Sequence, residues 1–209
     1  MTAPLESYYE KRGKLLVKNL QDRHFDAYYC KNREEALETA LSLIPQGATV
    51  GWGGAHSAEQ IGLMSALKSG DYRVIDRAEY SDPSQAMHEC LNADVFLTGA
   101  NGLSLDGQMV NIDGTGNRVA AIVYGPESVI VVAGMNKVVA TLDDAIVRAR
   151  TIAAPINQQR LMRNTPCSKT GTCMNCNSVE CICNQILITR NCRPAGRIKF
   201  ILVGEDLGF

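Results

Sequence analysis

The sequence lacks several features that would place it in a common functional class. Its 209 residues include one Trp and four Phe, so it offers few aromatic platforms for stacking on single-stranded nucleic acid. The 22 acidic and 21 basic residues leave a formal net charge of −1. No excess of positive charge therefore attracts nucleic acid or an anionic membrane, and we expect neither as a partner.

The sequence also lacks a long apolar segment. No apolar run approaches the roughly 20 residues that span a bilayer, and the opening residues MTAPLESYYEKRGK have no apolar core of a signal peptide. These absences predict a cytoplasmic protein. Thiols stay reduced in the cytoplasm. The eight cysteines, six of which lie between positions 167 and 192, are therefore interpreted as metal ligands in preference to disulfides.

Short apolar runs alternate with helical patterns along the first 150 residues. Helical spacing predicts helices at 5–20, 36–44, 58–67, 83–91 and 142–152. Apolar runs bounded by turn residues predict strands at 25–30, 48–51, 72–76, 95–97 and 129–133. Strands separated by such helices predict a doubly wound α/β fold with a mostly parallel sheet. Alternating apolar and polar residues at 109–112 predict a β-hairpin that leaves this sheet.

The pattern changes after residue 152. Residues 155–184 are polar and rich in cysteine, with little periodicity, and they are expected to form a metal-binding loop. Residues 185–189 and 197–203 are typical of two late strands, which a hairpin or a crossover would join. No segment of the chain has the composition of a linker. We therefore expect one α/β domain over residues 1–209, with the two late strands inside 185–203.

Glycines and polar residues crowd the stretch 94–137, between two apolar strands. Ligand sites of α/β proteins form at such strand ends. Arg118 could clamp a carboxylate or phosphate, and the glycine loop at 51–57 could bring backbone N–H groups to an anion. The predicted ligand-binding residues are Gly53, Gly54, Ser57, Asn101, Gly102, Asn111, Asp113, Asn117, Arg118, Asn136 and Lys137.

Plain structural roles are the alternative explanation for these residues. Turn chemistry accounts for asparagines and glycines, and a mutual ion pair accounts for Asp113 and Arg118. A dinucleotide fingerprint would need a third glycine where the chain has His56. No Ser-His-Asp or Cys-His arrangement is evident, so the sequence leaves open whether the protein is an enzyme.

Three segments carry a family resemblance: VNIDGTGNRVAAIVYGPESVIVVAGMNK, the GWGG loop followed by IGL, and the closing ILVGEDLGF. They resemble the LUD (lactate utilisation domain) family, in the branch with a C-terminal cysteine motif. The resemblance implies a fold like the group of glucosamine-6-phosphate deaminase, ribose-5-phosphate isomerase and coenzyme A-transferase. Related coenzyme A-transferases carry a nucleophilic Glu where this chain has Ala100, so a glutamyl thioester cannot form there.

The cysteine segment has the spacing C-x5-C-x2-C-x6-C. Its loops are rich in Gly, Asn and Ser, which lets thiolates converge on zinc or on a 4Fe–4S cluster. The resemblance places the motif on four cysteines and leaves Cys181 and Cys192 outside it, although spacing alone does not exclude Cys181. The lactate-oxidation systems that the family resembles favour iron–sulfur over zinc. The predicted metal ligands are Cys167, Cys173, Cys176 and Cys183.

The family resemblance implies a component of small organic acid metabolism, of the lactate type, to which the residues add an expected anion pocket and an iron–sulfur centre. Its expected partners are a small anionic ligand and either iron–sulfur redox proteins or further copies of itself. One alternative is a ligand-binding or assembly module with a structural zinc loop. Another is an isomerase or hydrolase of a phosphorylated or thioester substrate, with Arg118, Lys137 and the GWGG loop binding the anion.

Overall fold

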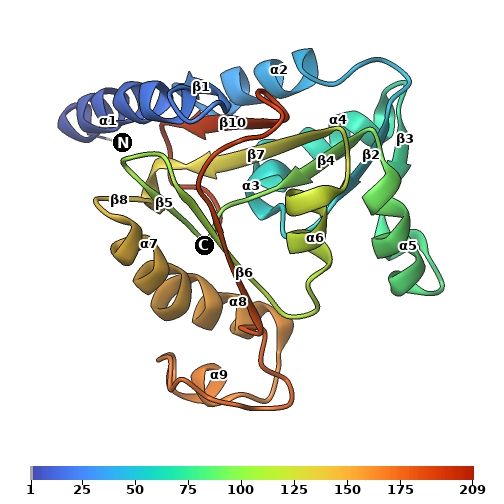
Figure 1. Cartoon of the computed structure of the whole chain (residues 1–209), viewed down its shortest axis with the longest axis vertical. Helices are drawn as coiled ribbons and strands as arrows, with labels where there is room; N and C mark the ends of the chain where they lie inside the picture. The colour runs from blue at the N-terminus through green and yellow to red at the C-terminus, as the bar shows by residue number, and fades with distance from the viewer. Residues whose placement is uncertain (1) are drawn as a thin grey trace.

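The computed structural model describes residues 2–209 and shows an α/β fold built on a six-stranded parallel sheet. Its strand order is β1-β10-β7-β4-β2-β3, and every neighbouring pair is parallel. All six carboxyl ends therefore lie at one edge of the sheet (Figure 1). The strands are β1 (Asp26–Cys30), β2 (Thr49–Trp52), β3 (Arg73–Ile75), β4 (Val95–Thr98), β7 (Ser128–Gly134) and β10 (Ile198–Val203).

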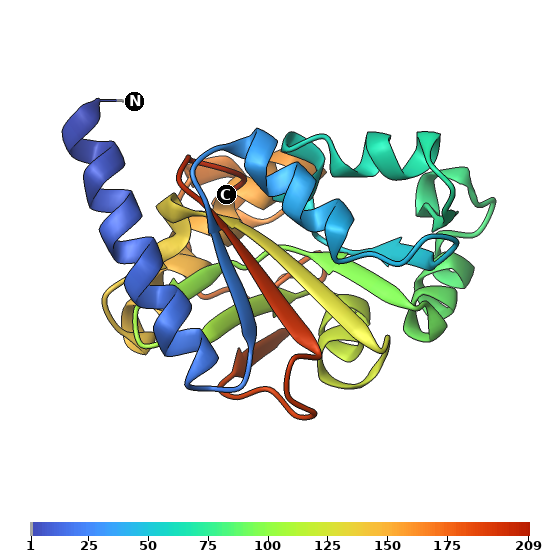
Figure 2. The same cartoon turned by 90° about the horizontal axis from the view of Figure 1, so that it is seen from above.

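Helices cover both faces of this sheet, as the predicted doubly wound fold requires (Figure 2). Successive side chains of a strand point to opposite faces, so Phe96 of β4 packs into one apolar cluster and Leu97 into the other. One face carries α2 (Arg33–Ser42), α3 (His56–Gln60) and α4 (Leu63–Ser69), and the other carries α1 (Ala3–Gln21), α5 (Pro83–Glu89) and α6 (Asn117–Tyr124).

A second sheet of four short strands has the order β8-β5-β6-β9. The predicted excursion is present, because β5 and β6 pair in antiparallel fashion. The two late strands do not form a hairpin: β9 joins this second sheet, whereas β10 enters the main sheet between β1 and β7. The strands are β5 (Gly102–Ser104), β6 (Met109–Asp113), β8 (Val138–Val139) and β9 (Gln185–Thr189).

The helices differ from the sequence prediction at two places. The helix expected at 58–67 is divided into α3 and α4 at Gly62, whose φ is +81°. The helix expected to end near residue 152 instead continues through a π-helical turn into α8, although residues after 155 were expected to lack helix. The wide turn places Pro155 at the start of α8, where its missing N–H costs little.

The remaining helical elements complete the path of the chain. The segment between α9 and β9 forms neither helix nor strand, and it holds most of the predicted metal ligands. No helix within residues 2–209 has the length and apolar character needed to cross a membrane. The elements are η1 (Arg77–Glu79), η2 (Cys90–Asn92), η3 (Met135–Lys137), α7 (Leu142–Arg148), the π-helical turn (Ala149–Ala153), α8 (Ala154–Leu161) and α9 (Pro166–Thr170).

Candidate functional site

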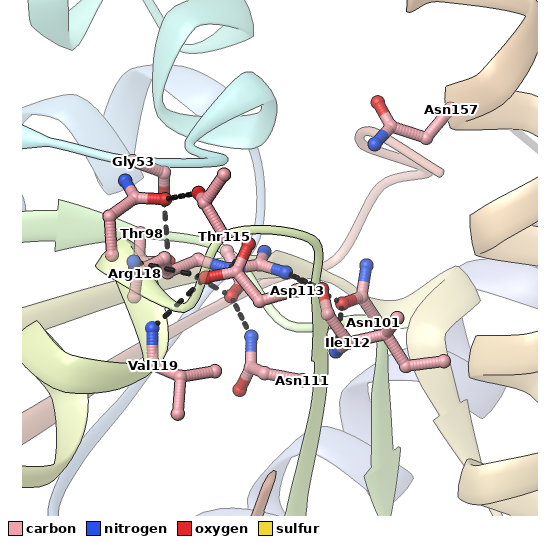
Figure 3. Close-up of polar contacts among 12 residues, drawn as sticks. Gly53, Thr98, Asn101, Asn111, Ile112, Asp113, Thr115, Arg118, Val119 and Asn157 are labelled. Atoms are coloured by element: carbon pink, nitrogen blue, oxygen red, sulfur yellow. Dashed lines mark hydrogen bonds and ion pairs between the residues drawn. The ribbon is translucent and has the colours of Figure 1, made fainter. Parts of the chain in front are cut away.

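Arg118 lies buried at the start of α6, where the loop from β6 turns into the helix (Figure 3). Asp113 Oδ2 accepts hydrogen bonds from the backbone N–H groups of Arg118 (3.0 Å) and Val119 (3.2 Å), so this carboxylate acts as the cap of α6. Its other oxygen lies 4.0 Å from Arg118 Nε. The carboxylate thus serves mainly the backbone, and it holds the guanidinium only loosely.

The Arg118 guanidinium is only partly satisfied. Its Nη2 donates to Asn101 Oδ1 (3.1 Å) and to the carbonyl oxygen of Ile112. Its Nε is buried and has no hydrogen-bond partner among residues 2–209. Burial lowers the pKa of Arg118, and the Asp113 charge acts against this shift. A buried cationic donor without a partner is costly, and an anionic ligand would relieve that cost.

The glycine loop after β2 lies against Arg118. Gly53 N–H donates to the carbonyl oxygen of Leu97 (3.1 Å), and Gly99 N–H donates to that of Gly54 (3.2 Å), which joins the loops after β2 and β4. Gly54 has φ +59°, and a Cβ there would stand 2.6 Å from Arg118 Nη1. Only glycine lets this loop approach the guanidinium so closely.

Lys137 follows β7 and is 4% exposed. Its Nζ donates to Oγ of Ser57 (3.1 Å), which is 1% exposed. Ser57 does not cap α3, whose N-cap position is occupied by Ala55 without a side-chain hydrogen bond. Burial, followed by the charges of Arg148 and Arg118, lowers the pKa of Lys137 to about 7.

Arg148 of α7 is a third buried cation at this edge, and sequence analysis missed it. Its Nη1 donates to the carbonyl oxygen of Asn101 (2.6 Å), and its Nε donates to that of Asn136 (3.2 Å). Ala145, three residues earlier, is completely buried. An arginine on the apolar face of a helix was the available signal. We call Arg118, Lys137 and Arg148 the cationic site.

Other predicted ligand residues have structural partners. Asn111 Nδ2 donates to the carbonyl oxygen of Gly99 (2.9 Å), and its buried Oδ1 has no partner in the described chain. Asn117 Oδ1 accepts from Thr115 Oγ1 (2.8 Å). Gly102 lies in β5 against α7, where a Cβ would stand 2.6 Å from the Ala145 carbonyl oxygen. The structure gives Gly102 a packing role, while ligand contact stays a prediction for the rest.

Residues 204–209 cross the carboxyl edge of the sheet, a position that the sequence analysis did not predict. Asn136 Oδ1 accepts from Leu207 N–H (3.1 Å), and Gln60 Oε1 accepts from Gly208 N–H (2.6 Å). A Cβ on Gly208, whose φ is +61°, would stand 2.8 Å from both Lys137 Nζ and Ser57 Oγ. This segment therefore covers the lysine–serine pair.

Five cysteines line one cavity of about 290 Å³, together with Arg150, Gln158 and Ile186. We call it the thiol cavity. It contains all four predicted ligands and also Cys181, which spacing had left undecided. Cys192 is buried elsewhere, where its Sγ donates to the carbonyl oxygen of Pro194 (3.1 Å). The lining cysteines are Cys167, Cys173, Cys176, Cys181 and Cys183.

The side chains that line the thiol cavity are suitable ligands for a metal that thiolates bind. All its cysteines are free thiols, and sulfur donors select zinc or iron–sulfur clusters. Burial and the neighbouring thiols raise the pKa of Cys183 to about 12. Within residues 2–209, no three metal-ligating side chains stand close enough together to hold an ion as they are. Binding would require the thiols of the irregular segment to turn inward.

The thiol cavity is attached directly to the loop that leads to Arg118. Strand β9 follows the cysteines and pairs with β6, with Gln185 opposite Asp113. Asn184, next to Cys183, donates its N–H to the Asp113 carbonyl oxygen (3.0 Å) and its Nδ2 to that of Gly114 (2.9 Å). A change in the cysteine segment would therefore act on the loop that caps α6.

Comparisons with known proteins agree with this fold. A family model described as the LUD domain matches residues 13–203. This chain belongs to the LUD domain family. A crystal structure of a DUF162 family protein from Deinococcus radiodurans has a TM-score of 0.53 and 12% sequence identity, over 93% of this chain and 97% of that chain. At this identity the likeness shows the fold alone, and no curated protein matches the chain.

The LUD match takes in both sheets, the cationic site and the thiol cavity, and it ends at Val203. The segment that covers Lys137 lies just beyond it. The family and the fold expected from the three sequence segments are thus confirmed, while the role of each cationic or sulfur-bearing residue is a matter for proposal.

Proposed function

We propose that this LUD-domain protein acts on small organic acids of the lactate type, with an acid bound at the cationic site and an iron–sulfur centre in the thiol cavity. The observation that carries this proposal is the direct attachment of the two features. The hydrogen bond from Asn184 N–H to the Asp113 carbonyl oxygen joins the cysteine segment to the loop that positions Arg118.

The charge balance of the cationic site supports an anionic ligand. Arg118, Lys137 and Arg148 are all at least nine-tenths buried. No Asp or Glu side chain of residues 2–209 lies within 4.0 Å of Lys137 or Arg148. Buried charges are normally paired, so the carboxylate of a ligand would offset the free-energy cost of burying these cations, which no carboxylate of the protein offsets.

The chemistry of the thiol cavity supports a redox centre. Five sulfur donors around about 290 Å³ supply the four thiolates that hold a 4Fe–4S cluster, which is the same number that a structural zinc ion takes. Oxidation of a 2-hydroxy acid to a 2-oxo acid releases two electrons and two protons, and a bound iron–sulfur cluster would pass these electrons on one at a time. Those electrons need an onward acceptor, so the proposal includes an iron–sulfur redox protein as partner.

Metal content tests the proposed centre. The protein is purified without oxygen, and its visible absorption, iron, sulfide and zinc are measured. We expect iron, sulfide and the broad visible absorption of an iron–sulfur centre. Cys183→Ala should lose most of the iron, whereas Cys90→Ala, which removes a buried thiol outside the cavity, should keep it. A colourless protein with one zinc ion would contradict the redox proposal.

Calorimetry with small ligands tests the cationic site. Lactate and pyruvate are titrated into the protein, and lactamide, which has no carboxylate, serves as the matched control. We expect both acids to bind and the amide to fail, because the cations recognise charge. If neither acid binds better than the amide, the proposed ligand class is wrong.

A further inference from the structure

Lys137 and Ser57 form a buried amine–hydroxyl pair that anion binding alone does not require. We propose that the Lys137 amine forms a reversible Schiff base with a small 2-oxo acid, whose carboxylate the neighbouring arginines attract. This inference rests on the proposed function, because it assigns a substrate class and a covalent step to the same site.

The surroundings of the amine are those of a nucleophile. Its one hydrogen-bond partner among residues 2–209 is the neutral Oγ of Ser57, at 3.1 Å. A lysine held by a carboxylate stays protonated, but none lies within reach here. Desolvation and nearby cations are the conditions that free a lysine amine for attack on a carbonyl group.

Three elements packed around the amine contribute polar or charged side chains. Ser57 comes from α3, Arg118 from α6 and Arg148 from α7. Burial and the two arginine charges lower the pKa of Lys137 to about 7, so roughly half of the amine is neutral near that pH. The charges that disfavour the ammonium form also favour the carboxylate of the incoming acid.

The step balances without an oxidant or reductant. The Nζ lone pair attacks the keto carbon, and the keto oxygen gains a proton to give a carbinolamine. This oxygen then leaves as water while the C=N bond forms, so one amine and one 2-oxo acid give one imine and one water. Ser57 Oγ, 3.1 Å from Nζ, is placed to pass a proton between the nitrogen and the departing oxygen.

Access to Lys137 depends on residues 207–209. Gly208 stands where a substituent would contact both members of the pair, and its N–H donates to Gln60 Oε1 (2.6 Å). The ring of Phe209 lies 5.0 Å from that of His56. Leu207 is buried and its N–H donates to Asn136 Oδ1 (3.1 Å), which anchors the start of the segment. An acid would therefore reach the amine by displacing Gly208 and Phe209, which give up the bond to Gln60 and the bond from Arg148 Nη1 to the Phe209 carbonyl oxygen (3.3 Å).

The chain contains a matched control pair at the other end of the same sheet. Lys199 Nζ donates to Ser128 Oγ at 3.1 Å, the same distance as in the Lys137 pair. Lys199 also donates to the carbonyl oxygen of Gly196 (2.7 Å) and is less deeply buried. A reaction that depends on the cationic site should occur at Lys137 and leave Lys199 unmodified.

Reductive trapping tests the proposal on the full chain purified without oxygen. The protein is incubated near neutral pH with pyruvate and sodium cyanoborohydride, which supplies the hydride that fixes an imine as a stable secondary amine. Intact-mass measurement should show one adduct per chain, with the mass of the acid less one oxygen atom. Peptide mapping should place it on Lys137, and lactate, which has no keto group, should give none.

Variants separate the amine from its surroundings. Lys137→Arg should abolish the adduct, Lys199→Arg should keep it, and Ser57→Ala should slow its formation by about a hundredfold, as loss of a proton-transfer group does. No adduct, labelling spread over exposed lysines, or unchanged labelling of Lys137→Arg would overturn the proposal. If that variant fails to fold, the wild-type peptide map decides. Pyruvate that binds in calorimetry without trapping would refute the Schiff base and leave the proposed function standing.

Discussion

The two ends of the main sheet each hold a lysine beside a serine and a nearby arginine, which is buried at the carboxyl end and half-buried at the amino end, but they satisfy these cations differently. At the amino end, Arg197 donates to the carbonyl oxygens of Ala121 (2.9 Å), Ile122 (2.7 Å) and Pro126 (3.0 Å). These carbonyls lie in and just after the last turn of α6, where a helix favours positive charge. Every nitrogen of this guanidinium therefore has a protein partner.

At the carboxyl end the protein leaves hydrogen-bonding capacity unused. Arg118 Nε has no partner in the described chain, and Lys137 donates only to Ser57. Both side chains are more deeply buried than Arg197. The protein itself therefore satisfies the donors of Arg197 at the amino end, whereas it leaves those of Arg118 and Lys137 at the carboxyl end partly unsatisfied.

The largest expected effect is that of Arg197→Ala. Three carbonyl oxygens would lose a charged donor, so the free energy of unfolding should fall by on the order of 3 kcal/mol. Urea unfolding measures this loss, and calorimetry on the folded variant should show unchanged affinity for pyruvate. A marked loss of affinity would mean that the two ends are not independent.

Lys137→Met should stabilise the protein at neutral pH, by about 1–3 kcal/mol, because it removes a buried amine that no carboxylate compensates. Lys199→Met should destabilise it by about 1 kcal/mol, through loss of hydrogen bonds to Ser128 and Gly196. Thermal and urea unfolding of both variants test whether the two substitutions change stability in opposite directions. Equal destabilisation would show that Lys137 also serves the fold.

Arg118→Ala should weaken the binding of lactate and pyruvate about tenfold, or about 1.4 kcal/mol, while Arg118→Lys should lose less because it keeps the charge. Isothermal calorimetry on folded variants measures both. Unchanged affinity in Arg118→Ala would remove this arginine from the proposed binding site, whatever the other cations do.

The stability advantage of Lys137→Met over wild type should depend on pH. The pKa of Lys137 is about 7 in the folded chain, against an ordinary value of 10.5, so the unfolded chain binds more protons between these values. The contribution of this group to wild-type stability therefore rises from pH 7 towards 10.5, and the advantage should shrink over that interval. A constant difference would show that the buried amine keeps its ordinary pKa.

Much of this arrangement could be predicted from sequence, for a simple physical reason. The carboxyl ends of parallel strands meet at one edge, so polar residues that follow β4 and β7 were expected together. Asn101 and Lys137 lie at that edge, and Arg118, which follows β6 of the second sheet, reaches the same place. Arg148 was missed because it lies inside a helix, where the pattern says which face is buried but not which strand end that face approaches.

Local sequence patterns were also insufficient where the structure of a segment depends on the elements it packs against. A helix was expected to end near residue 152, but the π-helical turn lets it continue as α8. Strands β9 and β10 both read as short apolar runs, yet one pairs with β6 and the other inserts between β1 and β7. Strand periodicity specifies which side chains share a face, but it does not specify the partner strand.

Spacing and residue type were enough to establish the alternation of strands and helices, the family, and the choice of thiol and cationic side chains. The packing of distant elements was needed to show that Cys181 lines the thiol cavity, that Lys137 contacts Ser57, which lies 80 residues away in the chain, and that residues 204–209 cover this pair. Such contacts depend on which elements pack together, and burial then changes the chemistry of an ordinary lysine.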